Sequence, residues 1–100
     1  MNEENITQAR TIIGERVRNT DGQDLGTVKE LLIDPEEGKI EYGVVSYGGV
    51  LGLGDKEIAV PYEAFTNVKQ GDYFILNVDK ETFEKAHSQI QYGNKSYYIY

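Results

Sequence analysis

Few residues of this chain have the types and the spacing that catalysis requires. His87 is the only histidine, Ser88 follows it directly, and the chain has no cysteine. A general base must reach its nucleophile through a hydrogen bond, and adjacent residues on a helix do not face each other. A single histidine beside Glu81 and Glu84 is also not a zinc ligand set. We therefore interpret His87 as a surface residue, and we expect no catalytic residue, no metal site, no cofactor and no enzyme activity.

Two acidic turns contain residue types that could bind calcium. They are Asp21-Gly22-Gln23-Asp24 and Asp34-Pro35-Glu36-Glu37. Neither turn has the alternating acidic ligands and the terminal glutamate of an EF-hand loop. We expect both segments to be solvated turns that hold no metal ion.

The glycine-rich loop Gly48–Gly54 raises the question of phosphate binding. Phosphate-binding loops direct their backbone N–H groups ahead of a helix N-terminus, but neither a Lys-Ser/Thr pair nor a helical pattern follows this loop. The residues between its glycines are apolar, namely Val50, Leu51 and Leu53. The loop is therefore either a wide turn between two strands or an exposed apolar tip that contacts a partner.

Most of the remaining chain predicts short β-strands separated by turns. Apolar patterning predicts strands at residues 13–18, 25–34, 39–47, 56–60 and 73–78. Asp21-Gly22 predicts a hairpin turn, Asp34–Gly38 predicts a second turn, and Pro61 ends the fourth strand. We expect one helical turn at 62–65 and a further turn at 69–72. Strands at this spacing indicate an antiparallel all-β barrel or sandwich.

The strand at 25–34 is apolar on both of its faces. Strict alternation places Val28 and Leu32 on one face, and Leu31 and Ile33 on the other. A strand of this kind is expected in the middle of a small barrel or sandwich.

Only the segment Lys80–His87 has helical spacing. Asp79 precedes it as an N-cap, and Glu81 and Lys85 form an i, i+4 pair of favourable order. We therefore divide the chain into a flexible N-terminal arm (1–11), a barrel-like domain (12–78), a short helix (79–88) and a tyrosine-rich tail (89–100).

The tail contains four of the eight tyrosines of the chain: Tyr92, Tyr97, Tyr98 and Tyr100. An aromatic ring with a polar tip suits a half-buried strand position. The tail is therefore either frayed, or Ser96–Tyr100 adds a strand to a sheet edge, either its own or that of a partner.

The charge of the chain excludes several classes of partner. The 17 acidic residues outnumber the 10 Lys and Arg residues, and the formal net charge is −7. Non-specific nucleic-acid binding depends on Lys and Arg, and anionic membrane surfaces attract basic segments, so we expect neither partner.

The chain has no apolar run of transmembrane length and its start lacks the pattern of a signal peptide. We expect a cytoplasmic location.

The order of turns and strands resembles that of the PRC-barrel domains. The resemblance covers about residues 12–78, and the segments that carry it are Ile13-Gly14, Asp21-Gly22, 25–36, 42–46, 48–54 and 58–65. It implies a small six-stranded β-barrel, and the expected fold is therefore an antiparallel, six-stranded, all-β barrel with one short C-terminal helix. Known domains of this family bind other proteins or tune a neighbouring cofactor. They include a cytoplasmic domain of photosynthetic reaction-centre H subunits and the C-terminal domain of a ribosome maturation factor.

Our first hypothesis is a non-enzymatic interaction module that binds a protein partner or a second copy of itself as a homodimer. One alternative is a barrel that binds a small ligand or cofactor at its mouth. A second alternative, by family analogy alone, is a ribosome-assembly accessory factor that binds a basic ribosomal protein. The residues expected at the interaction surface are Val50, Leu51, Leu53, Tyr97, Tyr98 and Tyr100.

Overall fold

The computed structural model describes residues 6–48, 55–67 and 73–100. Val50, Leu51 and Leu53 and the whole turn expected at 69–72 lie outside these residues. The elements, in chain order, are α1 (Ala9–Ile12), β1 (Arg16–Arg18), β2 (Asp24–Asp34), β3 (Lys39–Tyr47), β4 (Lys56–Pro61), the 3₁₀ turn η2 (Tyr62–Ala64), β5 (Phe65–Asn67), β6 (Tyr73–Leu76), α2 (Lys80–Glu84), β7 (Gln89–Tyr92) and β8 (Lys95–Ile99). The strands expected from the sequence are all present, and β5 is a short strand that its sequence did not predict.

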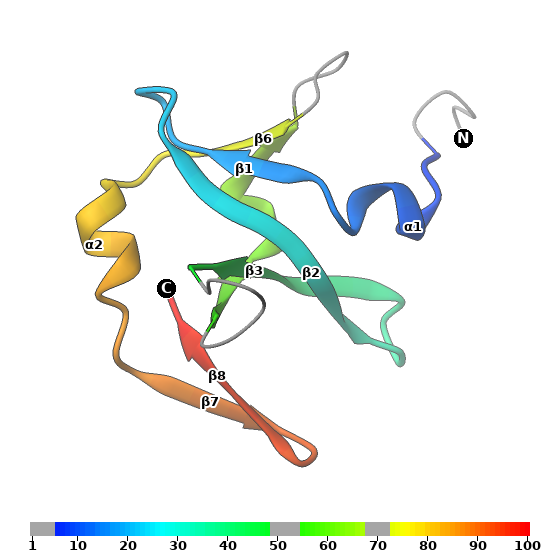
Figure 1. The fold of residues 1–100 in the computed structure, drawn as a ribbon. Helices are drawn as coiled ribbons and strands as arrows, with labels where there is room; N and C mark the ends of the chain where they lie inside the picture. Colours follow the sequence, from blue (N-terminus) through cyan, green and yellow to red (C-terminus); the bar gives the residue numbers. More distant parts are fainter. Residues whose placement is uncertain (1–5, 49–54, 68–72) are drawn as a thin grey trace.

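The strands form one eight-stranded sheet in the order β5-β6-β1-β2-β3-β4-β8-β7 (Figure 1). Neighbours from β1 to β4 are antiparallel, but β1 pairs with β6 and β4 pairs with β8 in parallel. The expectation of six strands in a purely antiparallel arrangement was therefore wrong. Parallel pairs need long crossover connections, and strand patterns along the sequence do not show which distant strands become neighbours.

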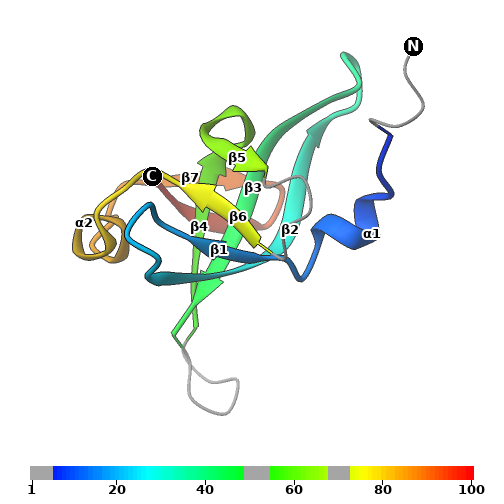
Figure 2. The same ribbon diagram turned by 90° about the horizontal axis from the view of Figure 1, so that it is seen from above.

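The sheet curls strongly, but it does not close. Figure 2 shows β5 and β6 lying across β3 and β4, and the Phe65 ring on β5 lies 2.9 Å from the point where Gly43 on β3 would carry a Cβ atom. Gly43 therefore lets one end of the sheet pack against its middle. The terminal strands β5 and β7 do not pair with each other in the described part of the chain. The closed barrel expected from the sequence is thus an open, curled sheet.

A β-bulge changes which side chains of β2 share a face. Val28 pairs with Val45, but Glu30 pairs with Val44, so Lys29 is an extra residue in the ladder. Alternation therefore restarts after the bulge. Leu31 packs with Val28 against the main core, whereas Leu32 packs on the opposite face. The prediction that Val28 and Leu32 lie on the same face of β2 was wrong for this reason.

Two apolar clusters hold the sheet together, one on each face. The main core contains the buried residues Val17, Leu25, Val28, Val45, Ile58, Val60, Phe74, Leu76 and Phe83. The smaller cluster on the outer face contains Val44, Ala59 and Tyr97, with Leu32, Tyr42 and Ile90 packed against it. Residues Val44 and Val45, or Ala59 and Val60, belong to different clusters because adjacent strand residues point to opposite faces.

The helix α2 has the cap and the ion pair that the sequence predicts. The Thr82 backbone N–H donates to Asp79 Oδ2 at 3.1 Å, and Lys85 Nζ lies 2.9 Å from Glu81 Oε1. The helix ends at Glu84, three residues earlier than expected, and carbonyl groups at and just after its end accept hydrogen bonds from the sheet. Lys56 Nζ donates to the carbonyl oxygens of Glu84 and Ala86 at 2.9 and 2.6 Å.

The tyrosine-rich tail forms the hairpin β7–β8, and β8 adds to the edge of β4. The tail is therefore not frayed: it adds a strand to the sheet of its own chain, which was the second alternative. The hairpin also covers the outer face, where Tyr97 and Ile90 pack on the smaller cluster. No helix in residues 6–48, 55–67 or 73–100 is long and apolar enough to cross a membrane.

Candidate functional site

The predicted tyrosines do not form one common surface. Tyr97 is buried, and its hydroxyl donates to Glu30 Oε1 at 2.6 Å. Tyr98 points to the other face, where Lys56 Nζ lies 4.3 Å from its ring centre. Tyr100 is 41% exposed and its ring centre lies 6.0 Å from that of Phe83. Of the three, only Tyr100 presents a large part of its side chain to a partner.

Tyr97 stabilises the fold as a neutral phenol. Burial, together with the hydrogen bond to Glu30 and the negative charge of that residue, raises the pKa of Tyr97 to about 12. The hydroxyl therefore stays protonated at neutral pH and links β8 to β2. His87, in turn, is exposed, in agreement with its interpretation as a surface residue.

A network of paired charges crosses strands β2, β4 and β8. Lys29 Nζ lies 3.4 Å from Asp55 Oδ2 and 3.2 Å from Glu57 Oε2, and Lys95 Nζ lies 2.9 Å from Glu57 Oε1. The Ser46 hydroxyl donates to Asp55 Oδ2 at 2.7 Å. We call Lys29, Asp55, Glu57 and Lys95 the paired network.

The network favours the charged forms of Lys29, Asp55 and Glu57. The hydrogen bond from Ser46 and the charge of Lys29 lower the pKa of Asp55. Burial raises the pKa of Glu57, but hydrogen bonds and charges from Lys95 and Lys29 outweigh it, so the net shift is downward. The hydrogen bond to Glu57 and the carboxylate charges raise the pKa of Lys29. Each charge has an opposite partner, so this arrangement is typical of a structural network rather than a reactive site.

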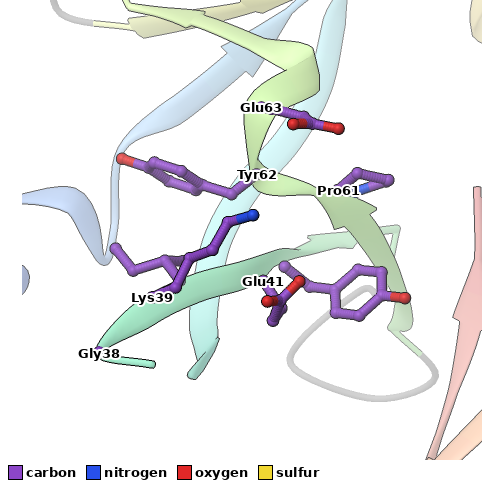
Figure 3. A pocket seen from close by; sticks show the side chains of 8 residues that line it. Gly38, Lys39, Glu41, Pro61, Tyr62 and Glu63 are labelled. Carbon is purple, nitrogen blue, oxygen red and sulfur yellow. The ribbon is translucent and has the colours of Figure 1, made fainter. Parts of the chain in front are cut away.

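A pocket of about 430 Å³ lies where β3 begins and η2 follows β4 (Figure 3). Its polar groups include Lys39, Glu41 and Glu63, and the Lys39 side chain reaches toward η2. No ion pair in the described residues joins Lys39 to either glutamate. Binding sites for small ligands usually have a few polar groups that converge on one point, and this pocket lacks such a set among its described residues.

A second hollow lies between the β2–β3 hairpin and the β7–β8 hairpin, with a volume of about 420 Å³. Its apolar lining includes Leu32, Ile33, Tyr42 and Tyr92. Ile33 is 56% exposed and Tyr92 is 49% exposed, and the ring centres of Tyr42 and Tyr92 lie 6.2 Å apart. We call this feature the hairpin groove.

The groove exists because β4 ends before the β2–β3 hairpin does. Pro61, the last residue of β4, pairs with Tyr42, and proline lacks the N–H that would continue the ladder. The end of the hairpin, where Ile33 pairs with Ile40, therefore extends past β4. In the described residues β4 does not continue beside this end of β3, and Ile33 remains exposed.

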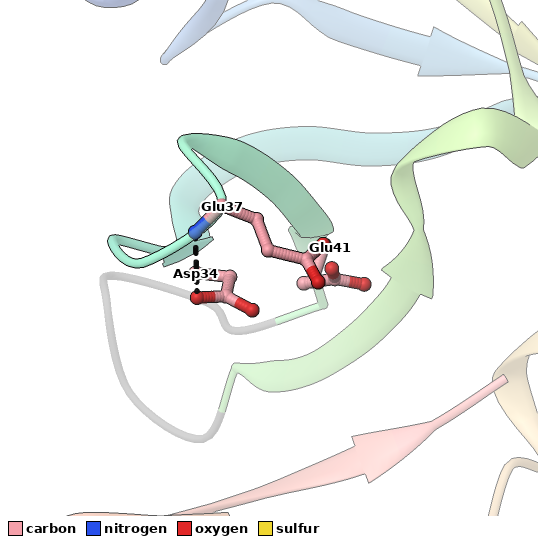
Figure 4. A group of neighbouring side chains, drawn as sticks. All are labelled: Asp34, Glu37 and Glu41. Atoms are coloured by element: carbon pink, nitrogen blue, oxygen red, sulfur yellow. Dashed lines mark hydrogen bonds between the residues drawn. The ribbon is translucent and has the colours of Figure 1, made fainter.

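Acidic side chains lie at one end of the groove. Carboxylate oxygens of Asp34, Glu37 and Glu41 lie within 4.8 Å of one another, and Glu37 extends from the turn toward Glu41 (Figure 4). Asp34 Oδ1 accepts hydrogen bonds from the backbone N–H groups of Glu36 and Glu37, at 2.9 and 3.2 Å. One carboxylate oxygen of this group thus closes the turn, as is usual for aspartate at this position. We call Asp34, Glu37 and Glu41 the acidic rim.

Sequence analysis missed Ile33 and Tyr92 as surface residues. The available signal was the run Leu31-Leu32-Ile33, because a strand cannot bury three successive side chains in a single core. Tyr92 was assigned to the tail with no specific role. Its place in the groove depends on how the C-terminal hairpin folds back over β3.

Comparison with known proteins assigns the main part of the chain to a domain family. No curated protein matches the sequence. The sequence profile of the PRC-barrel domain matches residues 4–83, which include every element from α1 to β6 and most of α2. The β7–β8 hairpin, and with it Tyr92, lies beyond the matched residues. With this match over most of its length, the chain belongs to the PRC-barrel domain family.

Proposed function

We propose that this chain is a non-enzymatic protein-interaction module that binds its partner in the hairpin groove. Membership in the PRC-barrel domain family suggests, at a general level, a role in interaction or assembly. The observation that carries the proposal is the exposure of Ile33 and Tyr92 in one hollow. Scattered apolar residues are normal on a protein surface, but those that line a common hollow are typical of interaction sites.

The energy available from this groove supports binding of a partner chain. Full burial of a large apolar side chain contributes about 1.5–3 kcal/mol. Ile33 and Tyr92 are each about half exposed, so a partner that covers both would gain on the order of 2 kcal/mol from them. Tyrosine is also enriched among residues that dominate binding energies.

Other functions have less support in the described residues. Catalysis would need a base beside a nucleophile, and the exposed His87 has no hydrogen bond to Ser88. The pocket near η2 has room for a small ligand, but its polar groups do not converge on a common point. Self-association and binding to a basic ribosomal protein are two forms of the interaction proposal that differ only in the partner.

The proposal is tested by capture from host lysate and by sedimentation velocity, with three forms of the tagged chain. They are the wild type, the double variant Ile33→Ser with Tyr92→Ser, and the control Ile13→Ser. Ile13 is 45% exposed and lies outside the groove, so the control removes apolar surface of a similar kind elsewhere.

We expect a stoichiometric partner, or a homodimer, with the wild type and with Ile13→Ser, and its loss with the double variant. Thermal melts should stay close to that of the wild type, because each side chain is already about half exposed and neither belongs to a core cluster. Equal recovery with all three forms would contradict the proposal, as would the absence of any partner or dimer with the wild type.

A further inference from the structure

We propose that the hairpin groove binds a basic, apolar segment of its partner. An apolar side chain would lie between Ile33 and Tyr92, and a neighbouring Lys or Arg would contact the acidic rim. This inference rests on the proposed function and specifies the chemistry of the partner. Tyr92 lies outside the residues that match the family, so the groove depends on a part of this chain that the family profile does not include.

The charge around the groove is strongly unbalanced. Residues 34–41 carry the four carboxylates of Asp34, Glu36, Glu37 and Glu41 but only one cation, Lys39, which gives a net charge of −3 in eight residues. The whole chain carries −7. No ion pair among the described residues includes a carboxylate of the acidic rim. A partner can therefore supply the positive charge that this end of the sheet lacks.

The geometry of the acidic rim suits a cationic side chain. The three carboxylate groups lie within 4.8 Å of one another, so one ammonium or guanidinium group could contact two of them. Asp34 Oδ1 already accepts from the turn, which leaves Oδ2 and the two glutamates for an external donor. Arginine can bind carboxylates through two parallel N–H groups.

The same charges disfavour a second copy of this chain in the groove. Two grooves facing each other across a two-fold axis would bring two segments of net charge −3 together, and like charges at an interface reduce affinity. The segment 34–41 is apolar only at Ile40 and Pro35. The partner that fits the groove is thus a different chain with Lys or Arg next to a large apolar residue.

Fluorescence anisotropy with three labelled eight-residue peptides tests the inference on the full chain. The probe alternates Leu and Lys. One control replaces each Leu with Ser and keeps the charge, and the other replaces each Lys with Glu and keeps the apolar residues. We expect the probe to bind at least about tenfold more tightly than either control, and more weakly as salt increases.

Three double variants locate the binding. Glu37→Gln with Glu41→Gln, and Ile33→Ser with Tyr92→Ser, should each weaken probe binding about tenfold. Glu81→Gln with Glu84→Gln changes the net charge by the same amount on α2, and it should change the affinity by less than about twofold. Thermal melts of all variants establish that they remain folded.

Several results would overturn the inference. They are equal affinity for the probe and the Lys-to-Glu peptide, an equal effect of the α2 variant, or a homodimer that the Ile33→Ser, Tyr92→Ser pair dissociates. Saturable calcium binding that depends on Glu37 and Glu41 and displaces the probe would instead identify a cation site. If the apolar variant still abolishes partner capture while the probe shows no preference, the proposed function stands and only the basic partner is wrong.

Discussion

Two acidic regions of this molecule differ in how their charges are compensated. In the paired network, Asp55 and Glu57 have Lys29 and Lys95 within 3.4 Å. In the acidic rim, three carboxylates approach one another, and within the described residues the hydrogen bonds that they accept come from the backbone of the turn. A region that supplies its own counter-charges is complete within the fold, whereas the rim is suited to a charge from outside.

Their positions in the sheet explain this difference. The paired network lies where β2, β4 and β8 come together, so strands distant in sequence bring opposite charges into contact. The acidic rim lies at the end of the β2–β3 hairpin, beyond the last residue of β4. Tyr92 and the start of η2 are the distant segments that line the neighbouring pockets in the described residues, and neither brings a cation, while the local sequence is predominantly acidic. Charge balance thus follows from the number of strands that meet at each site.

The largest effect on stability should come from replacing a glycine with alanine beside the paired network, where Gly26 packs on Ser46, compared with the same change in the acidic turn. Gly26 has φ +133°, and a Cβ atom there would overlap the Ser46 carbonyl oxygen. Gly38, in the acidic turn, has φ +66° and open space around it. We expect Gly26→Ala to lower the free energy of unfolding by about 3 kcal/mol or more, and Gly38→Ala by about 1 kcal/mol. Urea denaturation measures both, and equal losses would mean that the close approach at Gly26 is relieved at no cost.

The next largest loss of unfolding free energy should occur at one of two neighbouring tyrosines and not at the other. Tyr97→Phe removes the hydroxyl that donates to Glu30 at 2.6 Å, and we expect it to cost about 1.5 kcal/mol of unfolding free energy. Tyr98→Phe is the matched control, because its ring lies over Lys56 and would be retained. We expect almost no change from Tyr98→Phe in the same denaturation experiment. A loss for Tyr97→Phe no larger than that of the control would show that the bond between β8 and β2 adds no stability.

Acid should weaken the paired network. The folded-state pKa values of Asp55 and Glu57 are lowered from their ordinary values of 3.8 and 4.5, so the folded state binds these protons less tightly than the unfolded state. Their contribution to stability is present above about pH 4.5 and is lost as the pH falls through the folded-state values. Denaturation curves at pH 7 and pH 3 should show this loss. Lys29→Met with Lys95→Met should reduce the difference between the two curves, and an unchanged difference would assign the loss to other carboxylates.

The smallest changes in the free energy of unfolding should come from replacing two exposed glutamates, and the two changes should have opposite signs. Glu41→Gln removes one of the mutually repelling carboxylates of the rim, and we expect it to raise the free energy of unfolding by about 0.3 kcal/mol. Glu81→Gln removes the pair with Lys85 and should lower it by a similar amount. Thermal melts at low and high salt measure both changes. A lower free energy of unfolding for Glu41→Gln would mean that the Glu41 carboxylate stabilises the folded state.

The local elements of this fold could be predicted from the sequence. Turn residues such as Asp21-Gly22 and Asp34-Pro35, the proline that ends β4, and the Asp79 cap of α2 act within a few residues. The structure has strands and a helix at the corresponding places. The family resemblance also rested on such local features, and the profile match confirms it. These predictions succeeded because neighbours in sequence determine turn geometry and capping.

Tertiary structure decided the closure of the sheet, the faces of its strands and the candidate site. The parallel pairs of β1 with β6 and β4 with β8, and the bulge at Lys29, depend on contacts between distant segments. The hairpin groove likewise needs Ile33 from β2 and Tyr92 from β7 to come together. Hydrophobic burial has no preferred direction along the chain, so the sequence by itself indicated most of the strands but not their neighbours in the sheet. The packing of all strands together decided which side chains remained exposed.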